Sequence, residues 1–298
     1  MNTFVAVLIA ILTAILSPFL PKADENNTDA QTTEGETLTI ASYNTAAPWG
    51  NILEGTGTIK RSGQFADELL ALAPDSMGVQ EINSVWVGRL AVLADEYEYY
   101  GVPRDDENTV SKTEMSGIFY LKEKFELLES NTFWISETPD VMSIYPGAGC
   151  YRTCSYVVLK NRETGSVYIH MNTHLDNVSE DAQNLGGQLI AERAQALREK
   201  YGADIPVVVT GDFNQYVDAP GCTALLNAGY QNASDVNPAA AAIPTYHDWG
   251  TAAEEGPIDF IFYTGGLEAE TYTVHDEQQN RSYTSDHYCI SAEFVLAQ

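Results

Sequence analysis

Positively charged residues are scarce in this sequence. Lysine and arginine total 15, whereas aspartate and glutamate total 42, and the formal net charge at pH 7 is −27. Proteins that bind nucleic acid along an extended surface depend on Lys and Arg to release counterions from the phosphates. The composition therefore argues against extended binding of nucleic acid. Any phosphate chemistry in this chain needs a local source of positive charge, such as a metal ion.

Cysteine is also rare, with four residues at Cys150, Cys154, Cys222 and Cys289. Four thiols allow three disulfide pairings, and the sequence does not select one of them. No histidine or further cysteine lies near Cys150 and Cys154 to complete a zinc site. Disulfides, which suit an exported protein, and unpaired small core residues both remain open.

Long apolar runs are missing except near the amino terminus, at residues 4–20. No basic residue precedes this run, which contains Pro18 and is followed by Lys22. A secretory signal over residues 1–23 is the preferred interpretation, and an uncleaved membrane anchor or a buried core helix are the alternatives. We expect residues 24–36 to form a solvated linker. The protein is then secreted, or tethered to the outer face of a membrane through residues 4–20.

The rest of the chain, residues 37–298, alternates strand and helix signals without a repeat of fixed period. Apolar residues at three-to-four spacing predict helices over residues 62–73 and 180–202. Residues 229–256 are rich in Gly, Pro, Asn and Ala, which predicts a long irregular loop. Enrichment in β-branched and aromatic residues predicts eight strands, at 37–45, 76–82, 116–121, 154–161, 166–175, 205–214, 258–264 and 289–296. The pattern predicts one α/β domain of layered sheets and helices.

Polar residues recur at the ends of these apolar strands, which is where α/β folds gather catalytic groups. Each has an ordinary structural explanation: a turn residue, an acid in the first turn of a helix, an Asx-turn, or a loop charge beside a core histidine. Their joint order along the chain favours a shared site instead. The residues are Asn44, Glu81, His174, Asp212, Asn214, Asp259, Asp286 and His287.

The sequence GDFN at residues 211–214, with SDH at 285–287 downstream and YN and QE at 43–44 and 80–81 upstream, resembles the endonuclease/exonuclease/phosphatase family. This family includes DNase I-like nucleases, neutral sphingomyelinases and inositol polyphosphate phosphatases. The resemblance runs from about Thr37 to Phe294 and is strongest to compact secreted members. It implies a four-layer α/β sandwich, in which two packed β-sheets are flanked by helices.

Hydrolysis of a phosphate ester requires neutralised phosphate oxygens and an activated water in line with the scissile bond. Hard divalent cations prefer oxygen ligands. The resemblance assigns Mg²⁺, with Mn²⁺ as the alternative, to Asn44 and Glu81, and we expect Asp286 to reach the same ion or its water. It assigns Asp212 as the base that activates the water, and Asn214 as a neutral donor to the phosphorane.

Two histidines complete the site that the resemblance implies, each oriented by a carboxylate that fixes its tautomer and raises its pKa. His287 is expected to pair with Asp259. His174 is expected to pair with Glu114, which precedes the strand at 116–121, although a solvated acid at a strand edge is the alternative for Glu114.

Substrate contacts are expected from two arginines and one loop histidine. Arg152 and Arg104 lie where related nucleases bind phosphate, and a planar guanidinium suits that task. Pairing with the abundant surface acids is the alternative for both. His247, in the long loop, is expected to enter the site, whereas His170 and His275 are expected to be structural.

We therefore predict a secreted, monomeric, divalent-metal-dependent phosphoesterase that hydrolyses a phosphomonoester or diester. The substrate is expected to be small, or to hold its phosphate on a glycan or a lipid. A DNase I-like extracellular endonuclease is the alternative, and a catalytically silent module that binds phosphorylated ligands is a second alternative. The acidic composition disfavours the nuclease, and the presence of every expected catalytic residue disfavours the silent module.

Overall fold

The computed structural model describes residues 35–47, 57–106, 114–251, 255–277 and 282–296. These residues all belong to one unit that begins at Gly35. The predicted signal or anchor at residues 1–23, and the predicted linker up to residue 34, lie outside the described residues. Within the described residues, no helix has the length and apolar character needed to cross a membrane.

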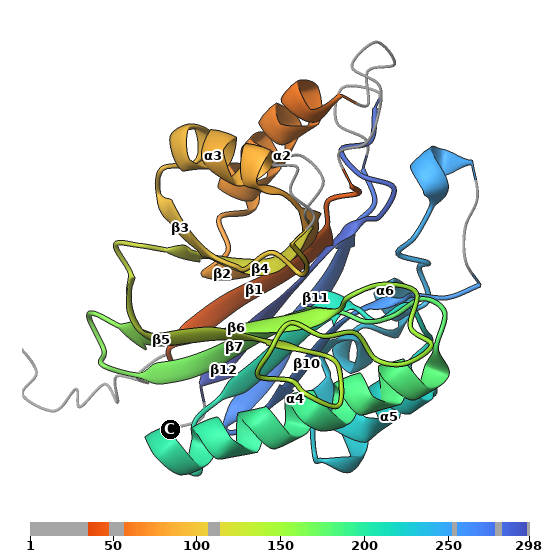
Figure 1. Ribbon diagram of the computed structural model, residues 1–298. Helices are drawn as coiled ribbons and strands as arrows, with labels where there is room; N and C mark the ends of the chain where they lie inside the picture. The colour runs from red at the N-terminus through yellow and green to blue at the C-terminus, as the bar shows by residue number, and fades with distance from the viewer. Residues whose placement is uncertain (1–34, 48–56, 107–113, 252–254, 278–281, 297–298) are drawn as a thin grey trace, which may run out of the picture. The chain divides into compact units, whose positions relative to one another are not determined.

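Two six-stranded sheets form the centre of the fold (Figure 1). The pairs β1/β2 and β7/β8 are parallel, and the other neighbouring strands are antiparallel. In spatial order, the first sheet contains β11 (Leu267–His275), β12 (Cys289–Leu296), β1 (Thr37–Asn44), β2 (Ser76–Ile82), β4 (Met115–Leu121) and β3 (Tyr97–Tyr100). The second contains β5 (Phe125–Trp134), β6 (Thr153–Asn161), β7 (Val167–His174), β8 (Val207–Asp212), β10 (Asp259–Thr264) and β9 (Gln231–Asn232).

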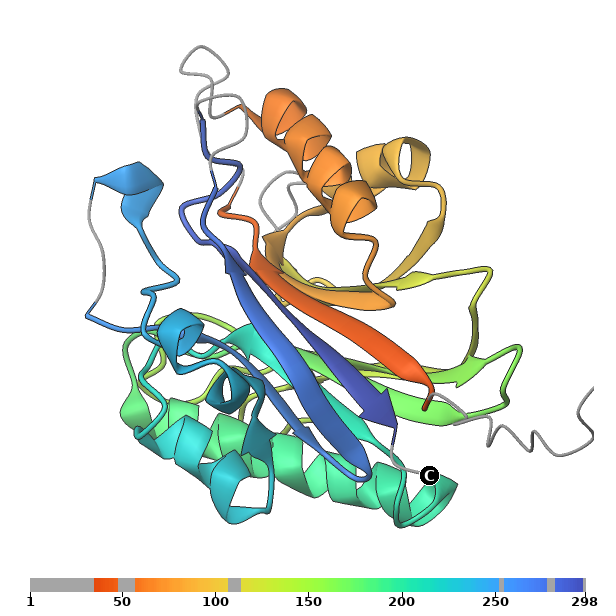
Figure 2. The same cartoon turned by 180° about the vertical axis from the view of Figure 1, so that it is seen from behind.

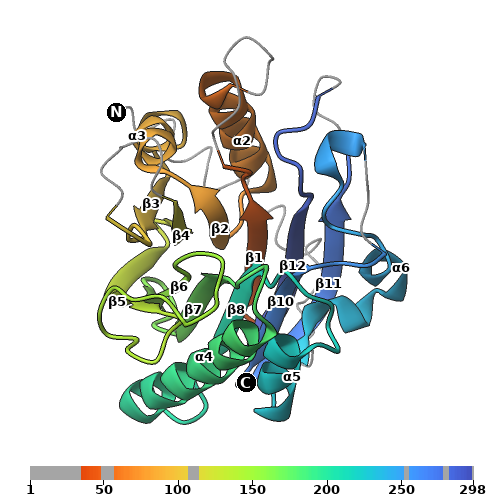
Figure 3. The same ribbon diagram turned by 45° about the vertical axis from the view of Figure 1, so that its right-hand side comes forward.

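Helices cover the outer face of each sheet, which confirms the predicted four-layer sandwich. Helices α2 (Thr58–Leu72) and α3 (Ser84–Leu93) lie over the first sheet, on its β1, β2 and β4 side (Figure 2). Helices α4 (Glu180–Tyr201) and α5 (Pro220–Asn227) lie side by side on the second sheet (Figure 3). The loop predicted at 229–256 contains β9, two 3₁₀ turns (Ala233–Val236 and Asp248–Gly250) and the short helix α6 (Pro238–Ala241).

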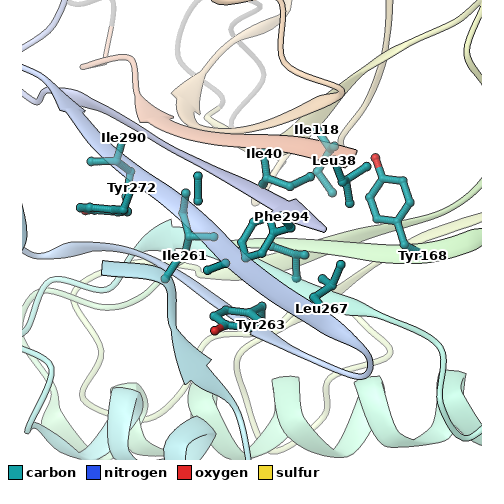
Figure 4. Packing of buried hydrophobic residues seen from close by; sticks show 14 of the residues in the cluster. Leu38, Ile40, Ile118, Tyr168, Ile261, Tyr263, Leu267, Tyr272, Ile290 and Phe294 are labelled. Atoms are coloured by element: carbon teal, nitrogen blue, oxygen red, sulfur yellow. The ribbon is translucent and has the colours of Figure 1, made fainter. Parts of the chain in front are cut away.

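Three apolar clusters fill the spaces between the four layers. The central cluster packs β1 and β12 of the first sheet against β8 and β10 of the second, with Ile40, Ile261 and Phe294 among its members (Figure 4). Strand β8 shows how one strand serves two layers. Val208 belongs to the central cluster, whereas Val207 and Val209 pack toward α4 and α5, because successive side chains of a strand point to opposite faces. The uninterrupted Val-Val-Val sequence therefore reflects burial of β8 on both faces.

All eight predicted strands are present, and the four strands that the sequence did not predict are the edges of the two sheets. These are β3 and β11 in the first sheet, and β5 and β9 in the second. An edge strand has solvent on one side, so its sequence is less enriched in apolar residues than that of a central strand. In β11 the buried residues mostly alternate with exposed ones such as Glu268 and Glu270.

The four cysteines are free thiols in the structure, which is the second of the two alternatives that the sequence left open. Cys154 and Cys222 pack as small apolar residues in the cluster beneath α4 and α5. Cys289 lies in the cluster beneath α2 and α3, so the two sheets separate Cys289 from Cys154 and Cys222. Cys150 is half-buried in the loop before β6.

Polar side chains replace apolar ones between the sheets as the strands approach one edge. Asn172 of β7 donates hydrogen bonds across the interface to the backbone oxygens of Val79 (2.9 Å) and Gly117 (2.8 Å). His170 is buried between Ser76 and Thr210, with ring nitrogens 2.7 and 2.9 Å from their hydroxyl oxygens, and burial lowers its pKa to about 3. His170 therefore has the structural position predicted for it.

This polar layer allows no side chain at Gly78 of β2. A Cβ atom there would overlap the hydroxyl of Thr210 and the amide of Asn172. We expect Gly78→Ala to lower the free energy of unfolding by about 2–3 kcal/mol, because a packed interior resists added volume. Urea denaturation measures this change. Gly88→Ala, in helix α3 where a Cβ meets open space, is the control and should raise stability by about 0.5–1 kcal/mol. Equal effects at the two positions would contradict the packing argument.

Candidate active site

The strand ends that the sequence singled out meet at one edge of the sandwich. In the second sheet, His174 is in register with Asp212, and Asp212 with Asp259, so these residues form one row across β7, β8 and β10. In the first sheet, Asn44 ends β1 opposite Gln80, the residue before Glu81. The parallel pairs place β1, β2, β7 and β8 with their carboxyl ends together, and antiparallel β10 begins at the same edge.

The carboxylate of Asp212 is the point at which the two sheets meet. Its Oδ2 accepts a hydrogen bond from Nδ2 of Asn44 (2.9 Å), which comes from the other sheet. Its Oδ1 accepts one from the backbone N–H of Asn214 (2.9 Å). The Nε2 atoms of His174 and His287 lie 3.4 and 3.8 Å from Oδ2. With a side chain only 2% exposed, Asp212 is enclosed by groups from four separate segments.

Asp212 and His287 form a charged pair with strongly shifted pKa values. Burial raises the pKa of Asp212 to about 7, with the charge of Asp259 adding to the effect and that of His287 opposing it. Burial alone would lower the pKa of His287. The charge of Asp259 and its 2.8 Å hydrogen bond to Nδ1 outweigh this and raise the pKa to about 10. His287 is therefore a cation at neutral pH, and the predicted pair of His287 with Asp259 is present.

His174 has the opposite protonation state. Burial lowers its pKa well below the ordinary value, and the positive charges of Arg152 and Arg104 lower it further. The imidazole is therefore neutral at neutral pH. Two histidines on either side of one carboxylate, one charged and one neutral, provide both a proton donor and a proton acceptor at this edge.

Glu114 does not orient His174, which corrects the predicted pair. Its Oε2 instead accepts a 2.6 Å hydrogen bond from Nη1 of Arg104. Burial raises the pKa of Glu114 to about 7, with the charge of Glu81 adding and those of Arg104 and Arg152 opposing. A guanidinium is a stronger partner for a carboxylate than a neutral imidazole is. The sequence did not reveal that Arg104 would reach Glu114.

Glu81, Asp286 and Asn44 provide oxygen atoms suited to a divalent cation. Burial raises the pKa of Asp286, and the charge of Glu81 raises it further while that of His287 opposes it. Glu81 has a left-handed backbone (φ 60°) beside a register shift between β2 and β4, and such strain is common where a side chain is held for function. Two partly buried acids, one of which raises the pKa of the other, fit a hard cation.

Asn44 is oriented differently from the expectation. Its Nδ2 faces Glu81 Oε1 (3.1 Å) as well as Asp212, and its Oδ1 accepts a hydrogen bond from the backbone N–H of Ala46 (3.0 Å). The assignment of the amide N and O follows the hydrogen-bond network. As a cation ligand, Asn44 would have to turn its amide so that the oxygen faces Glu81.

A second cluster of metal-ligand atoms consists of Asp212, Asp259 and His287, which lie within 4.8 Å of one another. Metal binding requires a neutral imidazole. The raised pKa of His287 opposes loss of its proton, and Asp259 already accepts a hydrogen bond from that ring. The set of Glu81, Asp286 and Asn44 therefore fits a divalent cation better.

Arg152 and Arg104 line a small recess beside these acids. The recess has a volume of about 10 Å³, and its walls include Glu81, Glu114 and His174. Arg152 is 6% exposed, and its Nη2 donates to Oδ1 of Asn177 (3.2 Å). The structure therefore brings both predicted arginines to the edge of the site.

Asp176 fixes Arg152 and is a residue that the sequence analysis missed. Its Oδ2 lies 3.6 Å from Nε of Arg152, and its carboxylate accepts hydrogen bonds from the backbone N–H groups of Gly149, Val178 and Ser179. Although burial alone would raise the pKa of Asp176, these hydrogen bonds lower it. Its position two residues after His174 was the available signal.

Asn214 and His247 lie at this edge with other contacts than predicted. Asn214 has a left-handed backbone (φ 51°), and its Nδ2 donates to the backbone oxygen of Leu175 (3.0 Å). The ring of His247 is 3% exposed and packs between Tyr283 and Tyr288, with centroid distances of 4.2 and 4.1 Å. His247 therefore helps to pack the loop that holds Asp286, instead of projecting toward the recess.

Arg61 is a second residue that the sequence analysis missed. It is 1% exposed, and its guanidinium donates to the backbone oxygens of Thr45 (2.6 Å), Ala46 (3.0 Å) and Thr284 (3.2 Å). It also lies over the rings of Trp86 (5.1 Å) and Trp249 (5.3 Å). Arg61 thus joins the segment after Asn44 to the segment before Asp286. Arg61 lies just before the helix predicted at residues 62–73, because the observed helix α2 begins four residues earlier, at Thr58.

Replacement of Arg61 tests this connection. Arg61→Met should lower the free energy of unfolding by about 2–3 kcal/mol, because the buried carbonyls lose hydrogen bonds to a charged donor. Thermal and urea denaturation measure the loss. The matched control is Arg89→Met in α3, a half-buried arginine that donates to the Ser62 hydroxyl and the Ile59 backbone oxygen, and it should cost less than about 1 kcal/mol. Similar losses in both variants would refute a special role for Arg61.

Asp212→Asn should stabilise the protein in a pH-dependent way. Because the pKa of Asp212 is raised to about 7 on folding, the folded state holds a proton that the unfolded state has released, and stability falls as pH rises from about 4 to 7. The asparagine variant lacks this loss. We expect its Tm in EDTA to match the wild type near pH 4 and to exceed it by roughly 2–4 °C at pH 8. Parallel pH profiles for the two proteins would show that the Asp212 pKa is not raised.

Comparisons with known proteins agree with this geometry. A family model described as "Endonuclease/Exonuclease/phosphatase family" matches residues 41–287. A search of curated protein sequences found no match. A solved family protein from Bacteroides thetaiotaomicron is 28% identical, with a TM-score of 0.80 and coverage of 88% of this chain and 96% of that one.

Two other solved structures are informative. A mannosyl-6-phosphatase from Bacteroides thetaiotaomicron VPI-5482 is 28% identical, with a TM-score of 0.78 and coverage of 87% of this chain and 100% of that one. The human nocturnin catalytic domain with bound sulfate is 18% identical, with a TM-score of 0.71 and coverage of 88% and 95%, and it shows the fold alone. With most of its length matched by the family model and the same fold in these structures, this chain belongs to the endonuclease/exonuclease/phosphatase family.

Proposed function

We propose that this protein is a secreted, divalent-metal-dependent phosphoesterase that removes a terminal phosphate from a sugar, a glycan or another small molecule. Family members are hydrolases of phosphate esters. The observation on which the proposal rests is the buried Asp212 carboxylate, which lies between a neutral and a protonated histidine. This arrangement can accept a proton from an attacking water and return one to a leaving oxygen.

Each side chain has a definite part in the proposed reaction. Asp212 orients the water and accepts its proton, and the backbone N–H of Asn214 holds Asp212 in place through a 2.9 Å hydrogen bond to Oδ1. His287, kept protonated by Asp259, faces Asp212 and stabilises negative charge on the phosphate or on the leaving oxygen. A divalent cation held by Glu81, Asp286 and Asn44, with Mg²⁺ as the first candidate, would neutralise the phosphate oxygens.

Two features favour a terminal phosphate over a diester. A phosphomonoester has up to two negative charges, and Arg152 and Arg104 stand at the recess with guanidinium groups that can bind several phosphate oxygens. A mannosyl-6-phosphatase, named for its action on a sugar phosphate, is 28% identical over 87% of this chain. The net charge of −27 disfavours a long polyanionic substrate.

We also propose that the protein is a monomer. It is either exported through a signal at residues 1–23 or tethered to a membrane by residues 4–20.

Hydrolysis by the full-length purified chain tests the proposal. The substrates are mannose 6-phosphate, bis(p-nitrophenyl) phosphate, sphingomyelin and plasmid DNA, each with Mg²⁺ or with EDTA. Metal-dependent release of phosphate from mannose 6-phosphate, without nicking of the plasmid, is the expected result. Nicked plasmid would favour a nuclease instead. If wild-type protein turns over none of the four substrates, the phosphoesterase proposal fails and a phosphate-binding module becomes the better explanation.

Two variants separate chemistry from substrate binding. Asp212→Ala should reduce kcat by at least about a hundredfold with little change in KM, as expected for loss of a general base. Arg152→Met should raise KM for a monoester by about tenfold or more, because a charged contact to phosphate is lost. Arg193→Met, which removes a half-buried arginine of α4 paired with Asp140, is the matched control and should leave both constants unchanged. A KM in Arg152→Met equal to that of this control would remove Arg152 from the substrate site.

A further inference from the structure

A second cavity lies on the outer face of the first sheet, apart from the Asp212 carboxylate. Its volume is about 340 Å³, which is within the range of small-molecule sites. In Figure 2, helices α2 and α3 cover the β1 and β2 side of this sheet. No helix of the described residues covers the outer face of the blue strands β11 and β12, and the short helix α6 packs against β11 in the central cluster instead. The cavity occupies the angle between α2 and these two strands, where α2 contributes Glu68, Ala71 and Leu72 to its wall.

The lining of this cavity combines aromatic rings with carboxylates. Tyr43, Tyr283 and Tyr288 contribute rings, and Glu68 and Glu277 contribute negative charge. Among the described residues that line it, none is Lys or Arg. Neither histidine in the wall supplies an unpaired positive charge to these carboxylates. Burial lowers the pKa of His275, and the charge of His287 is already paired with Asp259. An anionic ligand is therefore disfavoured.

Glu68 has hydrogen-bonding capacity that the protein does not use. Its Oε1 accepts a 2.6 Å hydrogen bond from the hydroxyl of Thr284. Its Oε2 is buried and has no hydrogen bond of normal geometry within the described part of the chain, although the Tyr43 side chain lies near enough to lower the pKa of Glu68. A buried acceptor without a donor destabilises a fold unless water or a ligand supplies the donor. A molecule with a positively charged N–H donor would give Oε2 of Glu68 a hydrogen bond and would also balance the charge of the carboxylate.

An organic cation fits this cavity better than a metal ion does. Metal sites require several ligand atoms close together, and the described residues contain one such cluster of His, Cys, Asp or Glu, at Asp212, Asp259 and His287. Leu72, Met77 and the tyrosine rings offer contacts for hydrocarbon instead of coordinating oxygens. Tyrosine faces attract cations in addition to any ion pair with a carboxylate.

We propose that this cavity binds a small organic ammonium ion, whose charged nitrogen donates to Glu68 and whose apolar body contacts Tyr43, Leu72 and Met77. The site is distinct from the proposed phosphoesterase centre and does not depend on that function. It nevertheless adjoins the centre, because Thr284 and His287 line its wall on either side of Asp286. A bound ligand would therefore contact the segment that positions Asp286 and His287.

Calorimetric titration of the full-length protein tests the proposal with three probes of similar shape and different charge. Benzylammonium is the cation, benzyl alcohol the neutral analogue and benzoate the anion. All titrations contain Mg²⁺ and are made at pH 8.5, above the pKa of about 7 to which burial raises Glu68. We expect benzylammonium to bind at least about tenfold more tightly than either of the other probes. Equal binding of benzyl alcohol and benzylammonium would overturn the proposal.

Variants locate the binding. Glu68→Gln keeps the size of the side chain and should weaken benzylammonium about tenfold or more. The matched control is Asp67→Asn, which removes the same charge from the neighbouring exposed position of α2 and should leave affinity within about twofold. Retention of full affinity in Glu68→Gln, or equal loss in both variants, would place the cation elsewhere.

Two further measurements keep the proposal testable if Glu68→Gln does not fold. Ala71 is exposed on α2 and lines the cavity, so Ala71→Trp should block entry and abolish binding while the circular dichroism spectrum stays native. Inorganic phosphate, a probe for the Arg152 recess, should not displace benzylammonium. Displacement by phosphate, or normal binding to Ala71→Trp, would show that benzylammonium occupies another site.

Discussion

The fold and the candidate site both depend on one buried carboxylate, that of Asp212. It ends a central strand of one sheet and accepts a hydrogen bond from Asn44 at the end of a central strand of the other. Burial of an acid is unfavourable unless other groups compensate it. The backbone N–H of Asn214 and the protonated ring of His287 provide that compensation, and His287 requires Asp259 in turn. Residues from four segments are therefore placed by the needs of one charge, which is why this edge of the sandwich differs from an ordinary end of a core.

Positive charge is rare in the sequence, and Arg61, Arg104 and Arg152 lie at this edge. Arg61 and Arg152 are 1% and 6% exposed, although arginine is seldom buried without partners. Arg61 holds backbone oxygens of the segment after Asn44 and of the segment before Asp286, and Arg152 is fixed by Asp176 beside the recess. The acidic surface and the basic residues at the site are consistent with a small phosphorylated substrate. A long polyanion would meet repulsion over most of the surface before it reached these arginines.

The success of sequence-based prediction followed the physical strength of each signal. Central strands such as β8 are buried on both faces, so their apolar composition identified them, whereas the four edge strands were missed because solvent relaxes that requirement. GDFN and SDH predicted that Asp212 and His287 share a site, and in the structure Oδ2 of Asp212 lies 3.8 Å from Nε2 of His287. The partner of His174 was predicted wrongly, because the choice of Arg104 for Glu114 depends on which side chains approach after folding. No local pattern encodes such a choice.

The sequence by itself determined an α/β domain of layered sheets and helices and the residue types at the strand ends, because periodicity and short motifs are properties of contiguous residues. The four-layer arrangement was implied by the resemblance of those motifs to the family. Only the tertiary structure decided the protonation of the two histidines, the use of Arg61 as a connection between segments, and the cavity beside Glu68. These features depend on burial and on distances between segments far apart in the chain. Arg61 and Thr284 are separated by 223 residues, yet their atoms lie 3.2 Å apart. Electrostatic interaction depends on short distances between groups, and desolvation depends on burial. Both conditions arise only when the sheets have packed.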